Sequence, residues 1–335
     1  MQPFRPHEPA YAGVGVSFCR VPLVLDPADL GCADVVVVGA PFDDGVSNRP
    51  GARFGPRAIR MAEDVGPPPW RPHMDLGVEP FAELTIVDHG DVEAVPGDLL
   101  TNHRLMQSAI SSILVVEAVP IILGGDHSLS LPVMRALSER HGRDGYAVIH
   151  FDTHTDTGAE VYGLTTSHGT PFYQCVEEGV ANGNLIFQIG LRGAWPGPVE
   201  FDWMRSKGFR WRTMDECMER GLDAVVDEAI LYASQAAPRT YLSVDIDVLD
   251  PAFAPGTGTP EPGGLQTREL LRAVRRIASS LDLCAMDVVE VSPPYDVAGI
   301  TALAAHRVAL ETISGIARFR STETASPQRS STTVD

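Results

Sequence analysis

Residues 146–156 read YAVIHFDTHTD, an apolar run that ends in three potential metal ligands. The run from 146 to 151 is typical of a strand that is covered on both faces. Asp152, His154 and Asp156 then follow at alternate positions. If the backbone stays extended, these three side chains point the same way. The stretch therefore predicts a buried strand with a group of ligands at its C-terminal end.

Short apolar runs alternate with longer amphipathic segments along the rest of the chain. Strands are predicted at 35–39, 84–87, 120–123, 146–151, 185–189, 240–244 and 283–289, and helices at 98–117, 131–141, 224–235, 267–281 and 300–317. Strand followed by helix implies right-handed crossovers and a mostly parallel central sheet, so we predict a three-layer α/β/α fold. We expect a single domain over residues 1–320, in which residues 1–30 form an extension at a subunit interface or at the active-site rim. Residues 321–335 hold almost no apolar side chain and are predicted to be a disordered tail.

The composition argues against several classes of protein. Of the 335 residues, 44% are hydrophobic, yet no apolar stretch is long enough for a membrane span. The formal net charge of −18 argues against a nucleic-acid partner, because phosphate binding needs a basic face. The N-terminus lacks the charged-then-apolar order of a signal peptide, and the five cysteines show no paired spacing. We therefore expect a cytoplasmic protein with neither nucleic acid nor membrane as a partner.

Two further predicted strands also end in potential ligands. The run 120–123 leads into GGDHS at 124–128, and the run 240–244 leads into DID at 245–247. Ligands of an open parallel sheet bind in the crevice outside the carboxyl ends of its strands. Six side chains are expected to converge there, namely His127, Asp152, His154, Asp156, Asp245 and Asp247. Carboxylates in such numbers repel one another unless cations neutralise them, so a metal site is predicted.

The types of residue in this set indicate the metal. Four aspartates and two histidines, with no thiolate, suit Mn²⁺ and accept Co²⁺, Ni²⁺ or Zn²⁺. Six ligands are too many for one catalytic ion that keeps an open position. They suit two ions about 3.5 to 4 Å apart that share carboxylates. We expect two divalent ions per chain, Mn²⁺ first and Ni²⁺ second.

Each motif taken alone has an ordinary structural interpretation. Asp245 and Asp247 could form a turn or a helix cap, and the glycines before His127 could form a tight turn. Only the three motifs together favour a metal centre. Outside these motifs and His168, we interpret the histidines, including His150, as ordinary surface or core residues.

Three motifs resemble the signatures of the ureohydrolases, the arginase and agmatinase superfamily. They are GGDHS at 124–128, FDTHTD at 151–156 and SVDIDVLDPAFAPGTGTP at 243–260. The likeness continues in SNRPGARFGP at 47–56, SHGTP at 167–171 and EVSPPYD at 290–296, and it covers about residues 6–319. These additional motifs favour the agmatinase branch. Thr153 stands where many members have alanine, but it is not a ligand position.

The resemblance implies a role for each functional residue. One ion would be held by His127, Asp152, Asp156 and Asp245, and the other by Asp152, His154, Asp245 and Asp247. The expected reaction is hydrolysis of a guanidino C–N bond to release urea and an amine. Asp156 would orient the nucleophile, Glu290 would hold the guanidinium group, and His168 would protonate the leaving amine. The resemblance also implies a homo-oligomer, either a trimer or a hexamer.

The group attached to the guanidino nitrogen stays open. The loop at 158–166 contains Glu160 and no basic residue, which favours a cationic substrate such as agmatine over a guanidino acid. If Tyr162, Leu164 and Trp195 instead close a compact apolar pocket, we expect a guanidine or alkylguanidine/biguanide (metformin-type) hydrolase that uses nickel. A third alternative is a non-catalytic subunit of a mixed oligomer. The complete ligand set argues against it.

Overall fold

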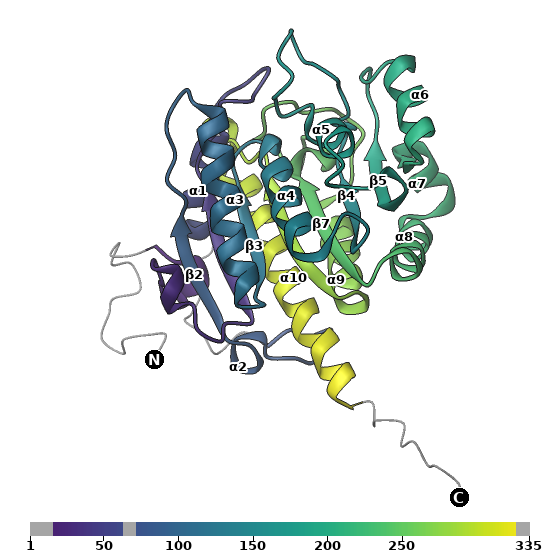
Figure 1. The fold of residues 1–335 in the computed structure, drawn as a ribbon. Coiled ribbons are helices and arrows are strands. Elements are labelled where there is room, and N and C mark those ends of the chain that lie inside the picture. The colour runs from purple at the N-terminus through teal and green to yellow at the C-terminus, as the bar shows by residue number, and fades with distance from the viewer. Residues whose placement is uncertain (1–15, 63–71, 326–335) are drawn as a thin grey trace, which may run out of the picture.

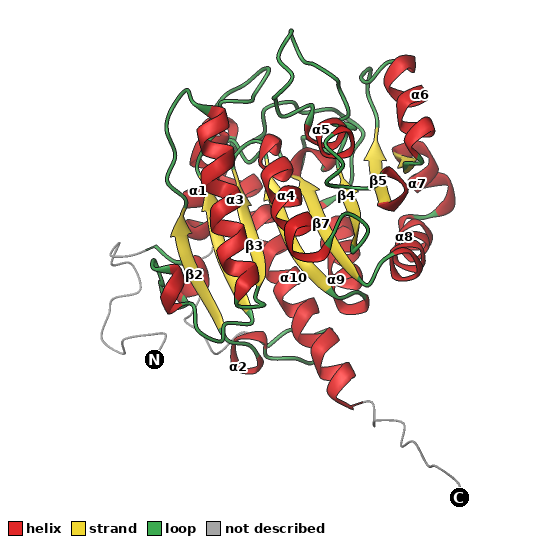
Figure 2. Ribbon diagram, in the orientation of Figure 1, coloured by secondary structure: helices red, strands yellow, loops and turns green. Residues whose placement is uncertain are grey.

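The computed structural model describes residues 16–62 and 72–325, which build one eight-stranded sheet with helices on both faces (Figures 1 and 2). All strand pairs are parallel, and the spatial order is β2-β1-β3-β8-β7-β4-β5-β6. The strands are β1 Val35–Ala40, β2 Ile86–Asp91, β3 Val119–Gly124, β4 Tyr146–Phe151, β5 Ile186–Leu191, β6 Arg210–Thr213, β7 Arg239–Asp245 and β8 Leu283–Val289. The predicted α/β/α class is confirmed.

Alternate residues of each central strand enter two separate cores, because successive side chains of a strand point to opposite faces. Val36 and Ile122 pack with Met106 of α3 in one core, whereas Val37 and Ile121 belong to the other. Figure 1 shows α3 and α4 on one face of the sheet, with α9 and α10 on the opposite face. The helices are α1 Gly55–Met61, α2 Pro80–Glu83, α3 Leu99–Val115, α4 Ser130–His141, α5 Pro171–Glu177, α6 Pro198–Lys207, α7 Met214–Arg220, α8 Leu222–Ala236, α9 Thr267–Ser280 and α10 Ile300–Ala325. Within the two described ranges, none of the helices is both long and apolar enough to cross a membrane.

The strand order places the candidate ligands side by side. Strands β3, β8, β7 and β4 are consecutive neighbours at the centre of the sheet. His127 follows β3, Glu290 follows β8, Asp247 follows β7 and Asp152 follows β4. Because all strands run parallel, these four chain segments leave the sheet at the same edge. The topology therefore brings together motifs that are up to about 160 residues apart in sequence.

One strand of the structure was not predicted, and two predicted elements have other limits. The edge strand β6 was not predicted, because RWRT has no apolar run and pairs only with β5. Strand β2 starts two residues later than expected and continues into polar residues, since it lies at the other edge. Helix α10 continues to Ala325, so the prediction of disorder is wrong for residues 321–325. The remainder of that predicted tail lies outside the described residues.

The described part of the N-terminal extension packs on its own chain. Phe18 is fully buried, stacks on His306 of α10 and donates its backbone N–H to Asp88 of β2 at 2.7 Å. Val24 donates its backbone N–H to the Asp88 carbonyl at 2.8 Å. These contacts place residues 18–24 along the sheet edge at β2, which corrects the expectation of an active-site rim for this part. Residues 1–15 lie outside the described residues.

Candidate metal centre and catalytic site

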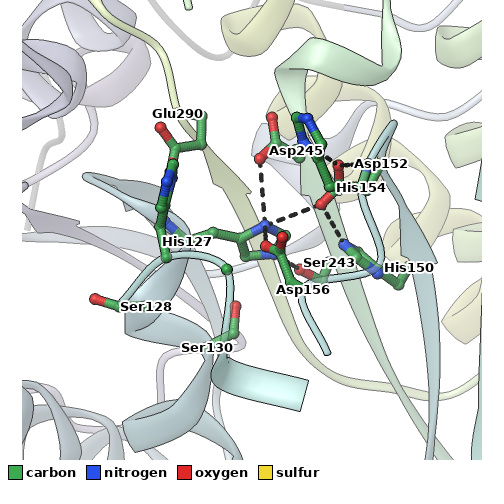
Figure 3. A network of polar contacts seen from close by, with 12 residues as sticks. His127, Ser128, Ser130, His150, Asp152, His154, Asp156, Ser243, Asp245 and Glu290 are labelled. Atoms are coloured by element: carbon green, nitrogen blue, oxygen red, sulfur yellow. Dashed lines mark hydrogen bonds and ion pairs between the residues drawn. The ribbon is translucent and has the colours of Figure 1, made fainter. Parts of the chain in front are cut away.

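His127 sits among three of the predicted carboxylate ligands (Figure 3). Its Nδ1 atom lies 3.2 Å from Asp152, 2.9 Å from Asp156 and 3.2 Å from Asp245. The imidazole is fully buried, yet Nδ1 makes no hydrogen bond of acceptable geometry with any described residue. A buried nitrogen that faces three carboxylate oxygens in this way fits a ligand set around one cation.

His154 occupies the corresponding position in a second group. Its Nδ1 atom lies 3.5 Å from Asp152 Oδ1 and 3.3 Å from Asp247 Oδ2. Asp152 therefore turns one carboxylate oxygen, Oδ2, toward His127 and the other, Oδ1, toward His154. A carboxylate with one oxygen in each group is suited to bridging two ions.

Burial and mutual repulsion raise the pKa values of two of these carboxylates, Asp245 and Asp247. Burial raises the pKa of Asp245 well above its usual value, and the charges of Asp247 and Asp152 raise it further. The pKa of Asp247 is raised by burial and by Asp152 in the same way. Divalent cations would remove this penalty, so the residues present fit a metal centre. The structure brings all six predicted residues together, while the assignment of each to a particular ion stays a prediction.

A series of buried hydrogen bonds that we did not predict starts at Nε2 of His127, the ring nitrogen that faces away from the carboxylate ligands. This Nε2 atom lies 3.0 Å from Ser243 Oγ, and Ser243 Oγ donates to Asp287 Oδ1 at 2.8 Å. Tyr241 and Ser130 donate to the same carboxylate. With Asp287 as the terminal acceptor, Ser243 Oγ accepts a hydrogen bond from the Nε2–H of His127, which leaves Nδ1 free to bind a metal.

His150 is not the ordinary histidine that we predicted. It is fully buried, and its Nε2 atom lies 2.9 Å from Asp152 Oδ2. The Gln188 amide nitrogen lies 2.9 Å from His150 Nδ1 and also donates to the Thr155 carbonyl at 2.7 Å. His150 therefore donates its Nε2 proton to the predicted bridging carboxylate. His150 stands two residues before Asp152, so their side chains point the same way where the backbone is extended, and this spacing is the signal that was overlooked.

The predicted proton donor and the predicted guanidinium ligand contact each other. His168 Nδ1 lies 3.0 Å from Glu290 Oε1, which also accepts the backbone N–H of His127 at 2.8 Å. Glu290 Oε2 has no hydrogen-bond partner among the described residues. Burial lowers the pKa of His168, but the charge and hydrogen bond of Glu290 outweigh it and raise the pKa to about 9. On its other side, His168 Nε2 contacts Ser47 Oγ at 2.7 Å and the Ser47 N–H at 3.1 Å.

Two site residues hold an unusual backbone conformation. Asp156 has a φ of 50° and Glu290 a φ of 65°, both in the left-handed region that non-glycine residues seldom adopt. Such conformations cost free energy and concentrate at functional sites, where the surrounding structure imposes them. The conformation of Asp156 also explains why it need not follow the simple alternation of an extended strand.

A cavity of about 390 Å³ opens beside this cluster. Glu160, Tyr162 and Trp195 line it, as predicted, together with Ser47, His154, Asp156, Val161, His168, Gly169, Asp245 and Thr259. Leu164 is not among the lining residues and is 61% exposed. Val161 and Leu164 exchange two backbone hydrogen bonds of 2.9 Å across a tight turn, which corrects our expectation by placing Val161 on the cavity wall and Leu164 outside it. Glu290 lies behind His168 and is not a lining residue.

Comparison with known proteins agrees with this geometry. Residues 33–315 match the family model described as Arginase family. The chain is 42% identical to proclavaminate amidinohydrolase of Streptomyces clavuligerus, over 94% of this chain and 97% of that protein. A solved structure of that enzyme superposes with a TM-score of 0.83 at 40% identity, over 93% of this chain and 100% of the solved chain.

Two further relatives are 40% identical to this chain. Guanidinobutyrase of Pseudomonas aeruginosa matches over 88% of this chain and 90% of its own length. The mitochondrial agmatinase of Gallus gallus matches over 87% of this chain and 82% of its own length. The chain therefore belongs to the arginase family, in its agmatinase-like branch, and is an amidinohydrolase that acts on guanidino compounds.

Proposed function

We propose that this enzyme hydrolyses a cationic guanidino compound of the agmatine type to urea and an amine, using two divalent ions per chain. The observation that carries this proposal is that members of both histidine-carboxylate groups and His168 line one cavity. Glu290 contacts His168 from the side away from that lining. Mn²⁺ is the first candidate metal because four of the six ligands are carboxylates, and Ni²⁺ is the second.

We assign the ligands to two ions, one bound by His127 and the other by His154. His127, Asp152, Asp156 and Asp245 would hold one ion, and Asp152, His154, Asp245 and Asp247 would hold the other. When bound, the ions supply a nucleophilic water of lowered pKa at neutral pH. Asp156 lines the cavity beside the cluster and is the carboxylate placed to orient the attacking water.

His168 and Glu290 act on the substrate. The Glu290 carboxylate has one oxygen without a hydrogen-bond partner among the described residues, and it would hold the guanidinium group as a charge-assisted pair. Breaking the C–N bond requires a proton on the leaving nitrogen. His168, with its pKa near 9, carries that proton at neutral pH and faces the cavity. This chain's own residues therefore provide both the binding charge and the acid.

The lining of the cavity supports a substrate with a distal positive charge. Glu160 lines the cavity, and no arginine or lysine is among its described lining residues. A guanidino acid needs a cation for its carboxylate. An alternative is favoured by Trp195, whose ring lies 6.2 Å from that of His154 and near Gly158. An indole in this place could restrict the space to guanidine or a small alkylated relative.

The test is a panel of urea-release assays with Mn²⁺ and with Ni²⁺. The substrates are agmatine, guanidine, methylguanidine, metformin, guanidinobutyrate, guanidinopropionate and arginine. We expect agmatine to have the highest kcat/KM. Preference for guanidine or metformin with Ni²⁺ would support the alternative, and preference for arginine or guanidinobutyrate would refute our account of the loop. A metal-free protein that releases no urea from any of them would support the non-catalytic subunit instead.

Glu160→Gln is expected to raise the KM for agmatine about three- to tenfold and to change kcat much less, because an exposed charge binds ground state and transition state alike. Steady-state kinetics of urea release measures both constants. Guanidine, which has no distal ammonium, should show the same KM in both proteins. Glu219→Gln, the same change at an exposed position on α7, is the matched control. An unchanged KM for agmatine would exclude Glu160 as its ligand.

We further propose that the chain forms a homo-oligomer, a trimer or a hexamer. Light scattering coupled to size-exclusion chromatography should give a mass of about three or six times 36.0 kDa. A single peak of monomer mass at assay concentration would contradict this proposal.

A further inference from the structure

One contact of His168 has no part in the proposed mechanism. Both ring nitrogens of this histidine are engaged, Nδ1 by Glu290 on the inner side and Nε2 by Ser47 on the cavity side. Ser47 uses two groups on the same nitrogen, its hydroxyl at 2.7 Å and its backbone N–H at 3.1 Å. Ser47 and His168 both line the cavity.

The loop that carries Ser47 is fixed relative to His168. The Gly45 carbonyl accepts the backbone N–H of His168 at 3.0 Å, and the Gly45 N–H donates to Asp126 at 2.8 Å. Beyond Ser47, Asp43 accepts the backbone N–H of Gly51 at 2.6 Å and pairs with Arg53. The serine is therefore held from both sides, and its approach to the imidazole is a property of the folded loop.

The backbone N–H and the hydroxyl of Ser47 differ in the protonation states of His168 Nε2 to which they can hydrogen-bond. A backbone N–H can only donate, so it needs the lone pair of an unprotonated Nε2. A hydroxyl can donate a hydrogen bond to that lone pair or accept a hydrogen bond from Nε2–H, so it serves both states of the ring. With Nδ1 donating to Glu290, the peptide group favours a neutral ring that carries its proton on Nδ1. The hydroxyl also accommodates the doubly protonated ring.

We propose that Ser47 is a positioning residue for His168, which holds Nε2 at the cavity wall in both protonation states and so makes it the nitrogen that delivers the proton. This proposal rests on the proposed function. In the step, the Nε2 proton moves to the leaving nitrogen as its bond to the guanidino carbon breaks, and the bonding electron pair stays on that nitrogen. His168 is left neutral, with its remaining proton on Nδ1 facing Glu290.

Loss of the Ser47 hydroxyl is expected to lower the pKa of His168. A hydrogen bond from a charged imidazolium to the serine oxygen is stronger than the bond between the two neutral groups. Ser47→Ala removes that acceptor and leaves the backbone N–H, which opposes protonation of Nε2. The charged groups acting on His168, namely Glu290, Asp156 and Asp126, stay in place. The ring should therefore lose its Nε2 proton at lower pH in the variant.

The experiment compares three variants of the full-length, metal-loaded enzyme with the parent. Ser47→Ala should lower kcat about tenfold and move the basic limb of the pH–rate profile down by about half a unit to one unit, as expected for one hydrogen bond. Ser47→Thr keeps a hydroxyl and should recover most of the loss. Asn48→Ala removes the neighbouring contact to the Gly258 carbonyl at 3.1 Å and should leave the pH profile in place. A Ser47→Ala profile that matches the parent, or one that moves upward, would overturn the proposal.

A second measurement does not depend on turnover. Imidazole ¹⁵N shifts of histidine-labelled parent protein, with the His168 signals identified by their loss in His168→Asn, should show the neutral ring protonated on Nδ1 at high pH. A neutral ring protonated on Nε2 would overturn the positioning role even if the enzyme releases urea. Absence of urea release together with the Nδ1 proton would refute the proposed function alone.

Discussion

Asp152→Asn is expected to remove both divalent ions and to lower kcat/KM by about a thousandfold or more. Loss of a residue that only hydrogen-bonds to a metal ligand already lowers metal affinity or activity about ten- to a hundredfold. Asp152 is itself a predicted ligand, and it lies in both the His127 group and the His154 group. One of its oxygens faces His127, and the other faces His154 and accepts the backbone N–H of His154 at 2.6 Å. A neutral amide offers one oxygen, so it cannot serve both groups as an anion.

Elemental analysis of the purified proteins, expressed per chain, measures this effect. The parent should contain two ions, Asp152→Asn none, and His127→Ala about one, because the imidazole belongs to one group only. Asp282→Asn is a suitable control, since Asp282 forms an exposed ion pair with Arg239 at the opposite end of the sheet. Circular dichroism would establish that each variant folds. A fully active parent with one ion or none, or an Asp152→Asn protein that keeps two, would contradict the two-ion proposal.

The metal centre could be anticipated because its ligands follow strands with strong local signals. The runs before His127, Asp152 and Asp245 are buried strands made mostly of apolar residues, and parallel topology then brings their ends together without any knowledge of side-chain contacts. Strands β4 and β8 have the predicted limits because apolar character starts and stops where the strand does. The edge strands β2 and β6 were shifted or missed because each pairs with only one other strand of the sheet, and polar residues are tolerated at such edges.

The supporting residues were missed for a different reason. Ser243 and Asp287 lie inside strands, where sequence alone does not show that one reaches His127 and the other accepts its hydrogen bond. The charge of Asp287 within an apolar run was a usable signal, since a buried carboxylate requires donors. Leu164 was misplaced because the conformation of its loop depends on the Val161–Leu164 turn rather than on a repeating pattern.

The shape of the cavity, on which substrate choice depends, is also determined by contacts between residues far apart in the sequence. Trp195 follows β5, whereas Glu160 follows β4. Gly158 packs against the indole of Trp195, where a Cβ would make a tight contact of 3.3 Å. The shape of the pocket is therefore set by packing between two loops that sequence analysis treats separately. This explains why the reaction class could be predicted from motifs, while agmatine and guanidine remained alternatives.

Glu290→Gln is expected to lower kcat/KM about a hundred- to a thousandfold. In the proposed mechanism it removes both the charge that pairs with the guanidinium group and the charge that favours protonated His168. Burial lowers the pKa of His168, and Glu290 is the largest of the influences that outweigh burial and raise this pKa to about 9. In the proposed mechanism His168 acts as an acid, so activity should fall as pH rises through this pKa. Without the carboxylate, that fall should begin at lower pH, near or below the ordinary histidine value of about 6.5.

The pH dependence of kcat separates the two effects of this substitution, because weaker substrate binding alone would raise KM and leave the basic limb at about pH 9. Glutamine is nearly the same size and its amide oxygen can still accept the backbone N–H of His127, so the loop after β8 should keep its position. Glu219→Gln again controls for the loss of one negative charge at a distant exposed site. A basic limb that stays near pH 9 in Glu290→Gln would show that another group donates the proton, since the carboxylate that raises the pKa of His168 would be gone.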